Sequence, residues 1–223
     1  MFWNDKDRFY FDRITKNGPD ETKTINSVFP LLFNISKNPI DVLKRIESEE
    51  FTSEFGVSTI SKKEQMFYPA GYHKGSVWGW LTALVACAEF KYNRPEKGIE
   101  YLRILFNRLD KDCIGAIGEA WNSENGNSIL LKEYGFEPGA CLQAWSSALV
   151  IRCIDEYMLG MRVNAFDRTI IVSPSLMDGM KIERRKRIGN DFVRFCFERI
   201  GNKLNVNYKS EKGLEYRLSL IHI

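Results

Sequence analysis

The sequence predicts a mainly α fold, consisting of part of an α/α toroid followed by a small antiparallel β tail. Three observations favour this class. Apolar residues recur at helical spacing between residues 38 and 159, long loops rich in aromatic residues separate these stretches, and short alternating runs follow Gly160. We therefore expect a toroid portion over residues 1–160 and a β tail over residues 161–217.

Two helices are predicted in the first half of the chain. Asn38 and Pro39 form an N-cap followed by Pro at the first helical position, which is typical of a helix start. The inward-facing residues of this helix would be Ile40, Leu43 and Ile46. A second helix is expected over about residues 76–91, where the apolar residues follow the spacing of one buried face.

Two further helices are predicted before the tail. One starts near Pro95, and its buried stripe would be Ile99, Leu102, Phe106 and Leu109. The other spans residues 140–159, is apolar on nearly every side and ends at Gly160, an expected helix stop. A helix that is apolar all round must be covered on all sides, so we expect it to be buried.

The tail and the beginning of the chain have strand patterns. In DFVRFCFERI (191–200), alternate residues would face opposite sides of a strand, with Phe195 and Phe197 on one side and Arg194 and Cys196 on the other. The basic run 181–187 would form the wet face of another strand. The opening residues FWNDKDRFYFDRI read as a hairpin with an Asn-Asp-Lys-Asp turn.

Composition excludes several classes of protein. The net charge of +3 argues against a nucleic-acid partner and against a membrane surface. No apolar stretch is long enough to span a bilayer, and no signal peptide opens the chain. The five cysteines are scattered without CxxC spacing, so we expect a cytoplasmic protein with no structural metal and no cofactor.

Both ends of the sequence read as artificial boundaries. The last six residues, LSLIHI (218–223), match the translation of a transposase end sequence used to prepare sequencing libraries, which indicates adapter read-through. The first residues lie within a structured hairpin, so Met1 reads as an internal methionine. We expect the sequence to be a fragment of a longer protein.

Three loop segments carry the candidate chemistry: 54–80, 115–126 and 137–146. Each segment lies before or between predicted helices, so all three could meet at one opening of the toroid. Aromatic rings beside a carboxylate suit a carbohydrate, because the C–H face of a sugar packs on a ring while polar groups bind its hydroxyls. The candidate substrate-binding residues are Tyr72, His73, Trp78, Trp80, Trp121, Gln143 and Trp145. For Trp80 and Trp145, core packing is the alternative, since both fall on apolar helical stripes.

These loops resemble the amylo-α-1,6-glucosidase domain of the glycogen debranching enzymes. GYHKGSVWGWL (71–81) resembles that family's AYHxGxVWPWL, and GAIGEAW followed by EPGACLQAWS resembles its G-S-I-G/S-E loop and R-G-C-x-A-Q-A-W-S helix. FGVSTIS resembles its G-L-R-T-L-S, and Asn26 matches the Asn of its R-P-N-Q-x-F-A. The order and spacing agree over about residues 1–160.

The resemblance implies an (α/α)6, six-hairpin glycosidase that inverts configuration and acts on an α-glucan or oligosaccharide. Its general base would be Glu119, which activates water. The general acid of the family, an Asp in an R-D-T-like segment, would lie before Met1, so this chain alone should be inactive. Asp167-Arg168-Thr169 has the reversed order and lies in the tail, and is not accepted as the acid.

The sequence departs from the debranching pattern at several positions. Gly79 stands where the family has Pro, Ser58-Thr59 stands where it has Arg-Thr, and residues 123–139 lengthen the loop after Glu119. Alternatives therefore stay open: a hydrolase of the same fold for another glycoside, of glucoamylase, trehalose or mannoside type, or a non-catalytic carbohydrate-binding relative.

Overall fold

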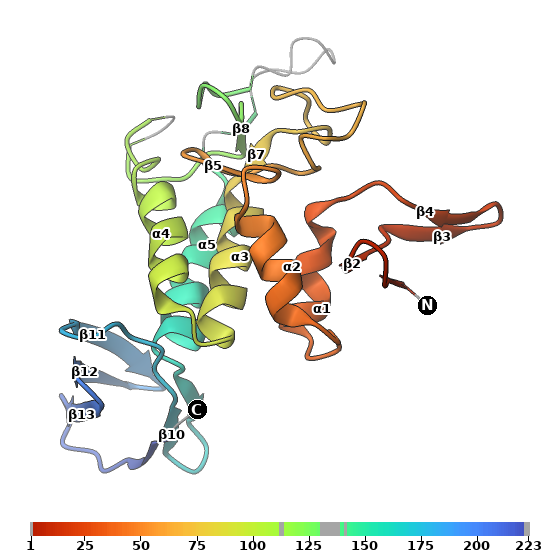
Figure 1. The fold of residues 1–223 in the computed structure, drawn as a ribbon. Helices are drawn as coiled ribbons and strands as arrows, with labels where there is room; N and C mark the ends of the chain where they lie inside the picture. The colour runs from red at the N-terminus through yellow and green to blue at the C-terminus, as the bar shows by residue number, and fades with distance from the viewer. Residues whose placement is uncertain (1, 112–113, 130–138, 141, 221–223) are drawn as a thin grey trace.

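The computed structural model describes residues 2–111, 114–129, 139–140 and 142–220. Helices α2 to α5 stand side by side in the middle of the molecule (Figure 1). The loops that carry β5, β7 and β8 gather at one end of these helices, and strands β10 to β13 lie at the other end (Figure 1). The loop cluster and the tail sheets therefore occupy opposite ends of one helical layer.

The N-terminal hairpin is confirmed. β1 (Trp3–Asn4) pairs antiparallel with β2 (Phe9–Tyr10), and the side chain of Asn4 accepts hydrogen bonds from the backbone of the turn that joins them. A second hairpin follows, from β3 (Arg13–Thr15) and β4 (Gly18–Asp20). A 3-10 turn, η1 (Ile25–Val28), then leads into the short helix α1 (Phe29–Leu32).

The longer helices begin at or near the predicted positions, and the last three are shorter than predicted. They are α2 (Pro39–Glu47), α3 (Gly79–Lys91), α4 (Pro95–Phe106) and α5 (Ala144–Arg152), the last continuing as the π-helix η3 (Cys153–Met158). Leu43 and Ile46 are buried as predicted, whereas Ile40 is 38% exposed and Val42 is buried in its place. The residues just before Gly79 form a strand, because their backbone pairs with the loop around Ala120.

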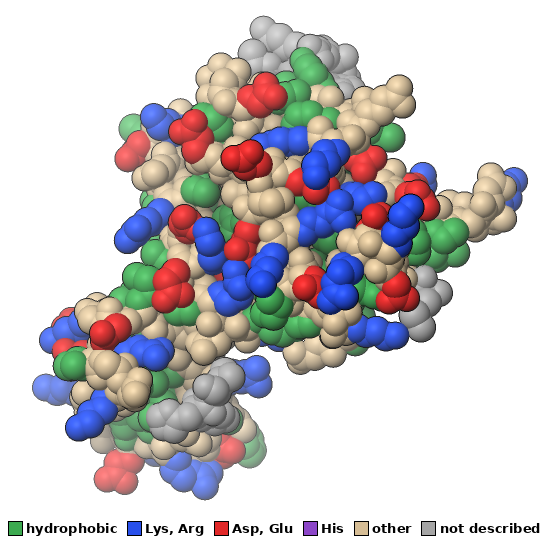
Figure 2. Space-filling view, viewed as in Figure 1, with side chains coloured by type: hydrophobic (Ala, Val, Ile, Leu, Met, Phe, Trp, Pro, Cys, Tyr) green, Lys and Arg blue, Asp and Glu red, His purple; other side chains and the backbone are tan. Residues whose placement is uncertain are grey.

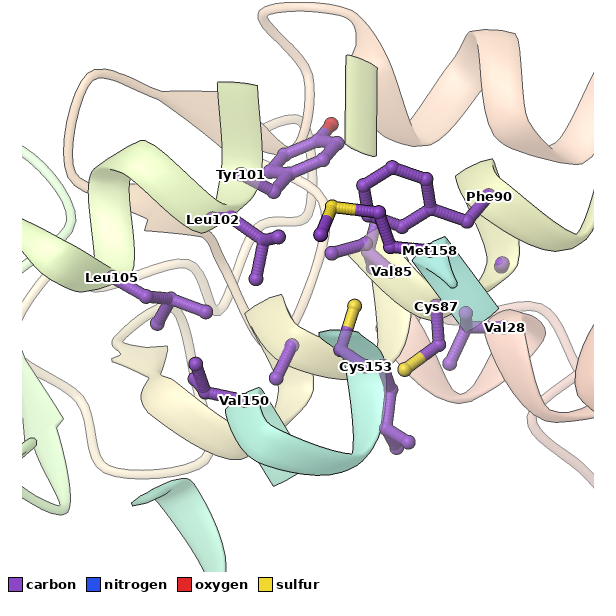
Figure 3. Packing of buried hydrophobic residues seen from close by; sticks show 14 of the residues in the cluster. Val28, Val85, Cys87, Phe90, Tyr101, Leu102, Leu105, Val150, Cys153 and Met158 are labelled. Carbon is purple, nitrogen blue, oxygen red and sulfur yellow. The ribbon is translucent and has the colours of Figure 1, made fainter. Parts of the chain in front are cut away.

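The core lies where α3, α4, α5 and η3 meet. In Figure 3, Cys87 and Cys153 lie close together in a cluster with Val85, Phe90 and Met158. Gly98 lets α4 approach α3, since a Cβ at this position would lie 2.7 Å from the ring of Phe90. The predicted all-round burial of residues 140–159 is not found, because Trp145 and Ile151 of α5 are exposed.

Two three-stranded sheets form the tail. One has the order β14-β10-β9, from β9 (Arg162–Asn164), β10 (Thr169–Val172) and β14 (Arg217–Leu220). The other has the order β11-β12-β13, from β11 (Lys181–Ile188), β12 (Asp191–Ile200) and β13 (Lys203–Ser210). Residues 218–220, which the sequence assigned to adapter, pair parallel with β10.

The predicted alternation in β12 is confirmed, with Val193, Phe195 and Phe197 buried between more exposed neighbours. In β11, only alternate residues of the basic run are exposed to solvent. Arg184 and Lys186 instead donate to the buried carboxylate of Asp155 in η3, at 2.7 Å and 2.6 Å. These ion pairs join the tail sheet to the helical layer.

The predicted fold class, a mainly α part of an (α/α)6 toroid with a small β tail, is wrong. The described residues contain five α-helices, and strand accounts for about 29% of the structure in six small sheets. Two physical causes explain the error. Loops between the helices pair with one another as short strands, and the tail strands extend to ten residues. Helical periodicity does not report either feature.

Charged residues of both signs are interspersed over the face that Figure 2 shows. Among the residues that the structure describes, no helix is long and apolar enough to cross a membrane.

Candidate active site

Short strand ladders tie the predicted loops together. Thr24 bridges to Ile60, Ser58 bridges to Val77, and β7 (Val77–Trp78) pairs antiparallel with β8 (Ala120–Trp121). The segments near residues 24, 60, 77 and 120 therefore lie in one continuous series, although they are far apart in the chain. Two of the three predicted loop segments, 54–80 and 115–126, meet in this way.

Glu119 lies one residue before β8, and both of its carboxylate oxygens are held. The hydroxyl of Tyr72 donates to Oε1, and the backbone N–H of Ala140 donates to Oε2 at 3.0 Å. The backbone N–H of Glu119 in turn donates to the carbonyl of Ala140 at 2.9 Å. Gly139 allows this close approach, because a Cβ there would lie 3.2 Å from Oε2.

Tyr72 is itself fixed by its surroundings. Its ring packs against Trp78, with 4.4 Å between the ring centroids, and its carbonyl accepts from the indole N–H of Trp78 at 2.7 Å and from the hydroxyl of Ser76. Burial raises the pKa of Tyr72 first, and the hydrogen bond to Glu119 raises it further. The phenol therefore stays protonated and remains a donor to Glu119 at neutral pH.

A cleft of about 330 Å³ lies beside Trp78. His73, Trp78 and Trp80 are among its lining residues, and His73 stacks on Trp78 with 5.4 Å between centroids and 12° between planes. Asn26 and Thr59 line it as well. Glu119 is not among the lining residues of this cleft, and Tyr72 and Trp78 connect the two.

Asp12 is the carboxylate that lines the cleft. Its Oδ1 accepts from the hydroxyl of Thr24 and, at 2.8 Å, from the amide of Asn26. The predicted site did not include Asp12. Its one sequence signal is a carboxylate directly after the aromatic run FYF, and tertiary hydrogen bonds rather than sequence spacing place it beside Asn26.

The remaining predicted residues are not among those that line this cleft. Trp121 is fully buried, donates its indole N–H to the carbonyl of Phe55 at 2.8 Å and lies under the guanidinium of Arg108. Gln143 precedes α5, and its backbone N–H donates to Ile117. Trp145 is 54% exposed, with its ring 6.4 Å from that of Trp80. Most of the lengthened loop 123–139 falls outside the described residues.

The arrangement supplies one firmly held carboxylate, a neighbouring phenol and an aromatic cleft with polar groups. It suits the binding of a polyhydroxylated ring and the removal of a proton from water. The described residues contain no group of three or more side chains that could hold a metal ion.

The family model for the mannosylglycerate hydrolase MGH1-like glycoside hydrolase domain matches residues 1–146. The chain belongs to this MGH1-like glycoside hydrolase family. The debranching enzymes, to which the motifs pointed, are a related family of glycosidases and not the family of this chain. The match includes Asp12, Tyr72, His73 and Glu119. None of the curated proteins is similar enough to the chain to match it.

Solved structures share the fold of this MGH1-like chain. A GH78 family rhamnosidase of Bacillus sp. GL1 has a TM-score of 0.65 at 16% identity, over 100% of this chain and 22% of that one. A GH63 mannosylglycerate hydrolase from Thermus thermophilus, in complex with glucose, has a TM-score of 0.54 at 18% identity, over 68% of this chain and 34% of that one. The chain thus spans about a fifth to a third of these structures.

Proposed function

We propose that Glu119 is the general base of an inverting glycosidase and that the cleft beside Tyr72 and Trp78 binds the sugar. The observation that carries this proposal is the pair of hydrogen bonds to the Glu119 carboxylate, from the Tyr72 hydroxyl and the Ala140 backbone N–H, which we call the clamp. A carboxylate on a loop is usually solvated and free to rotate, whereas this one is held by donors from two different segments. Membership of the MGH1-like glycoside hydrolase family supports the same reaction class.

The clamp leaves room for the reaction. Each carboxylate oxygen has two acceptor sites, so Oε1 and Oε2 can each accept a further hydrogen bond from water after binding Tyr72 and Ala140. In an inverting enzyme, that water attacks the anomeric carbon from the side opposite the leaving oxygen while its proton passes to the base. Holding the carboxylate in one orientation reduces the entropy lost on reaching the transition state.

For the substrate, the family favours an α-mannoside over the branched α-glucan that the debranching motifs implied. The relative from Thermus thermophilus is a mannosylglycerate hydrolase, and a mannoside is among the alternatives that the sequence left open. The α-1,6-glucan is the comparison substrate. A preference of at least tenfold for the mannosyl over the glucosyl compound is expected.

Glycosyl fluorides test the base directly. Fluoride leaves without protonation, so hydrolysis of α-mannosyl and α-glucosyl fluoride needs a base but no general acid. Glu119→Gln should lower fluoride release by about 10²- to 10⁴-fold, the usual contribution of a general base. The matched control is Glu124→Gln, an exposed carboxylate five residues further along the same loop, which should keep the wild-type rate. Equal rates in wild-type and Glu119→Gln would remove Glu119 from the reaction.

A further inference from the structure

A second cleft, of about 370 Å³, lies beside the first. Asp12 and Asn26 line both clefts, so the two spaces share one wall. The apolar lining of the second cleft is Phe2, Trp3, Tyr10, Phe11, Pro30 and Ile35. Most of these residues belong to the N-terminal hairpin, which has no role in the proposed reaction.

The polar tips of the two largest rings are already used within the protein. The indole N–H of Trp3 donates to Asp5 at 2.8 Å, and the hydroxyl of Tyr10 donates to Ser36 at 3.0 Å and accepts from the backbone of Lys37. The rings pack edge to face, with 5.0 Å between centroids. What they contribute to the cleft is therefore apolar ring surface, which suits the C–H face of a sugar.

Two side chains of this lining lie open to solvent. Phe2 is 54% exposed and Ile35 is 70% exposed. Large apolar side chains grouped around one hollow frequently mark a binding site. The hollow also continues into the candidate site through Asp12, whose Oδ1 is anchored by Thr24 and Asn26. A hydrogen-bond acceptor is thus fixed at the junction of the two clefts.

We infer that the second cleft binds a second sugar ring of the same substrate, with Asp12 accepting a hydroxyl hydrogen bond at the junction. The inference rests on the proposed function. The apolar ring surface of the second cleft and the anchored acceptor at the junction suit a second sugar ring. The substrate is then a glycoside of at least two rings, rather than one ring joined to a small acid such as glycerate.

Binding of matched one-ring and two-ring probes tests the inference on the complete chain. The one-ring probes are methyl α-mannoside and methyl α-glucoside, and the two-ring probes are α-1,2-mannobiose, maltose and isomaltose. Titration calorimetry should show at least one two-ring probe binding about tenfold more tightly than its one-ring counterpart. Packing of the second sugar ring on the apolar lining of the cleft is expected to raise the affinity by about this factor.

Substitutions in the second cleft identify the side chains that cause the higher affinity for two-ring probes. Phe2→Ser and Ile35→Ser change exposed side chains, so both should fold, and both should remove most of the two-ring gain while leaving one-ring affinity unchanged. The control is Phe166→Ser in the turn between β9 and β10, where the ring is 100% exposed and distant in sequence from the cleft. Phe166→Ser should keep the full gain.

The outcomes separate the two proposals. One-ring binding without a two-ring gain, or a gain that survives in Phe2→Ser and Ile35→Ser, overturns the second-ring inference and leaves the proposed function standing. Failure of every one-ring and two-ring probe to bind overturns the proposed function, and the inference with it.

Discussion

Strand β12 pairs with each of its two neighbours over eight residue pairs, whereas β7 and β8, which position Glu119, pair over two. In the tail sheet, charged side chains alternate outward and buried rings alternate inward. In the loops around Glu119, by contrast, a few hydrogen bonds between segments far apart in the chain hold the functional groups, as with Glu119 and Asp12. Regular local pairing stabilises one end of the molecule, and specific long-range contacts build a candidate site at the other.

The largest effect on stability should come from the tail sheet. Phe197 is fully buried, and Phe197→Ala should lower the free energy of unfolding by about 3–5 kcal/mol, because a large cavity remains in a packed core. Chemical denaturation measures the change. If the regions differ as described, the variant should still bind a sugar probe with wild-type affinity at temperatures where it is folded.

Phe192→Ala is the matched control on the same strand, since Phe192 faces outward beneath the guanidinium of Arg185. Its cost should stay below about 1 kcal/mol. Equal costs at Phe192 and Phe197 would show that the alternation of β12 does not determine its stability.

The next effect concerns pH and separates the two regions. Glu89 of α3 is fully buried and paired with Arg94, which also binds Glu47. Burial, and then the nearby Glu47 charge, raise the pKa of Glu89 to about 7. The folded protein therefore holds this proton more tightly than the unfolded chain does, and stability should fall by about 3 kcal/mol as pH rises from about 4.5 through 7.

Hydrogen exchange at pH 5 and pH 8 measures this loss region by region. The amides of α3 should lose protection at pH 8, while those of β11 to β13 change little. Glu89→Gln should remove the pH dependence, and Glu54→Gln, an exposed glutamate, should retain it. A pH dependence that persists in Glu89→Gln would assign it to another group.

These contrasts also explain what the sequence could predict. Local patterns gave the strand alternation around Phe195, the N-terminal hairpin and the start of α2 at Pro39, because each depends on neighbours in the chain. They did not give the fold class, since the short ladders that join residues 24, 60, 77 and 120 depend on tertiary contacts.

The candidate site divides in the same way. The loop motif marked Glu119, Tyr72 and His73, and the structure brings the first two into contact. It could not mark Asp12, whose place is set by Thr24 and Asn26, nor show that Trp121 is a buried residue beneath Arg108. A loop motif contains the same tryptophan whether its ring lines a cleft or is buried in the core, so the motif cannot distinguish the two.

The smallest predicted effect tests the clamp. Tyr72→Phe removes the donor to Oε1 of Glu119 but keeps the ring that packs on Trp78. Turnover of the glycosyl fluoride should fall about tenfold, while probe affinity stays unchanged, because the hydroxyl orients the base rather than the sugar. Tyr68→Phe, an exposed tyrosine on the same loop, should be silent. A loss of affinity without loss of turnover would make Tyr72 a sugar contact instead.

Azide rescue of Glu119→Ala is the sharpest test of whether Glu119 activates the water that attacks the substrate in an inverting reaction. Azide needs no deprotonation, so it can attack the anomeric carbon of an α-glycosyl fluoride as fluoride leaves, without a base. Glu119→Ala should be nearly inactive in water, and azide should restore turnover, with β-glycosyl azide as the product seen by NMR. Undiminished hydrolysis in Glu119→Ala, or an α-glycosyl azide as the product, would contradict this mechanism.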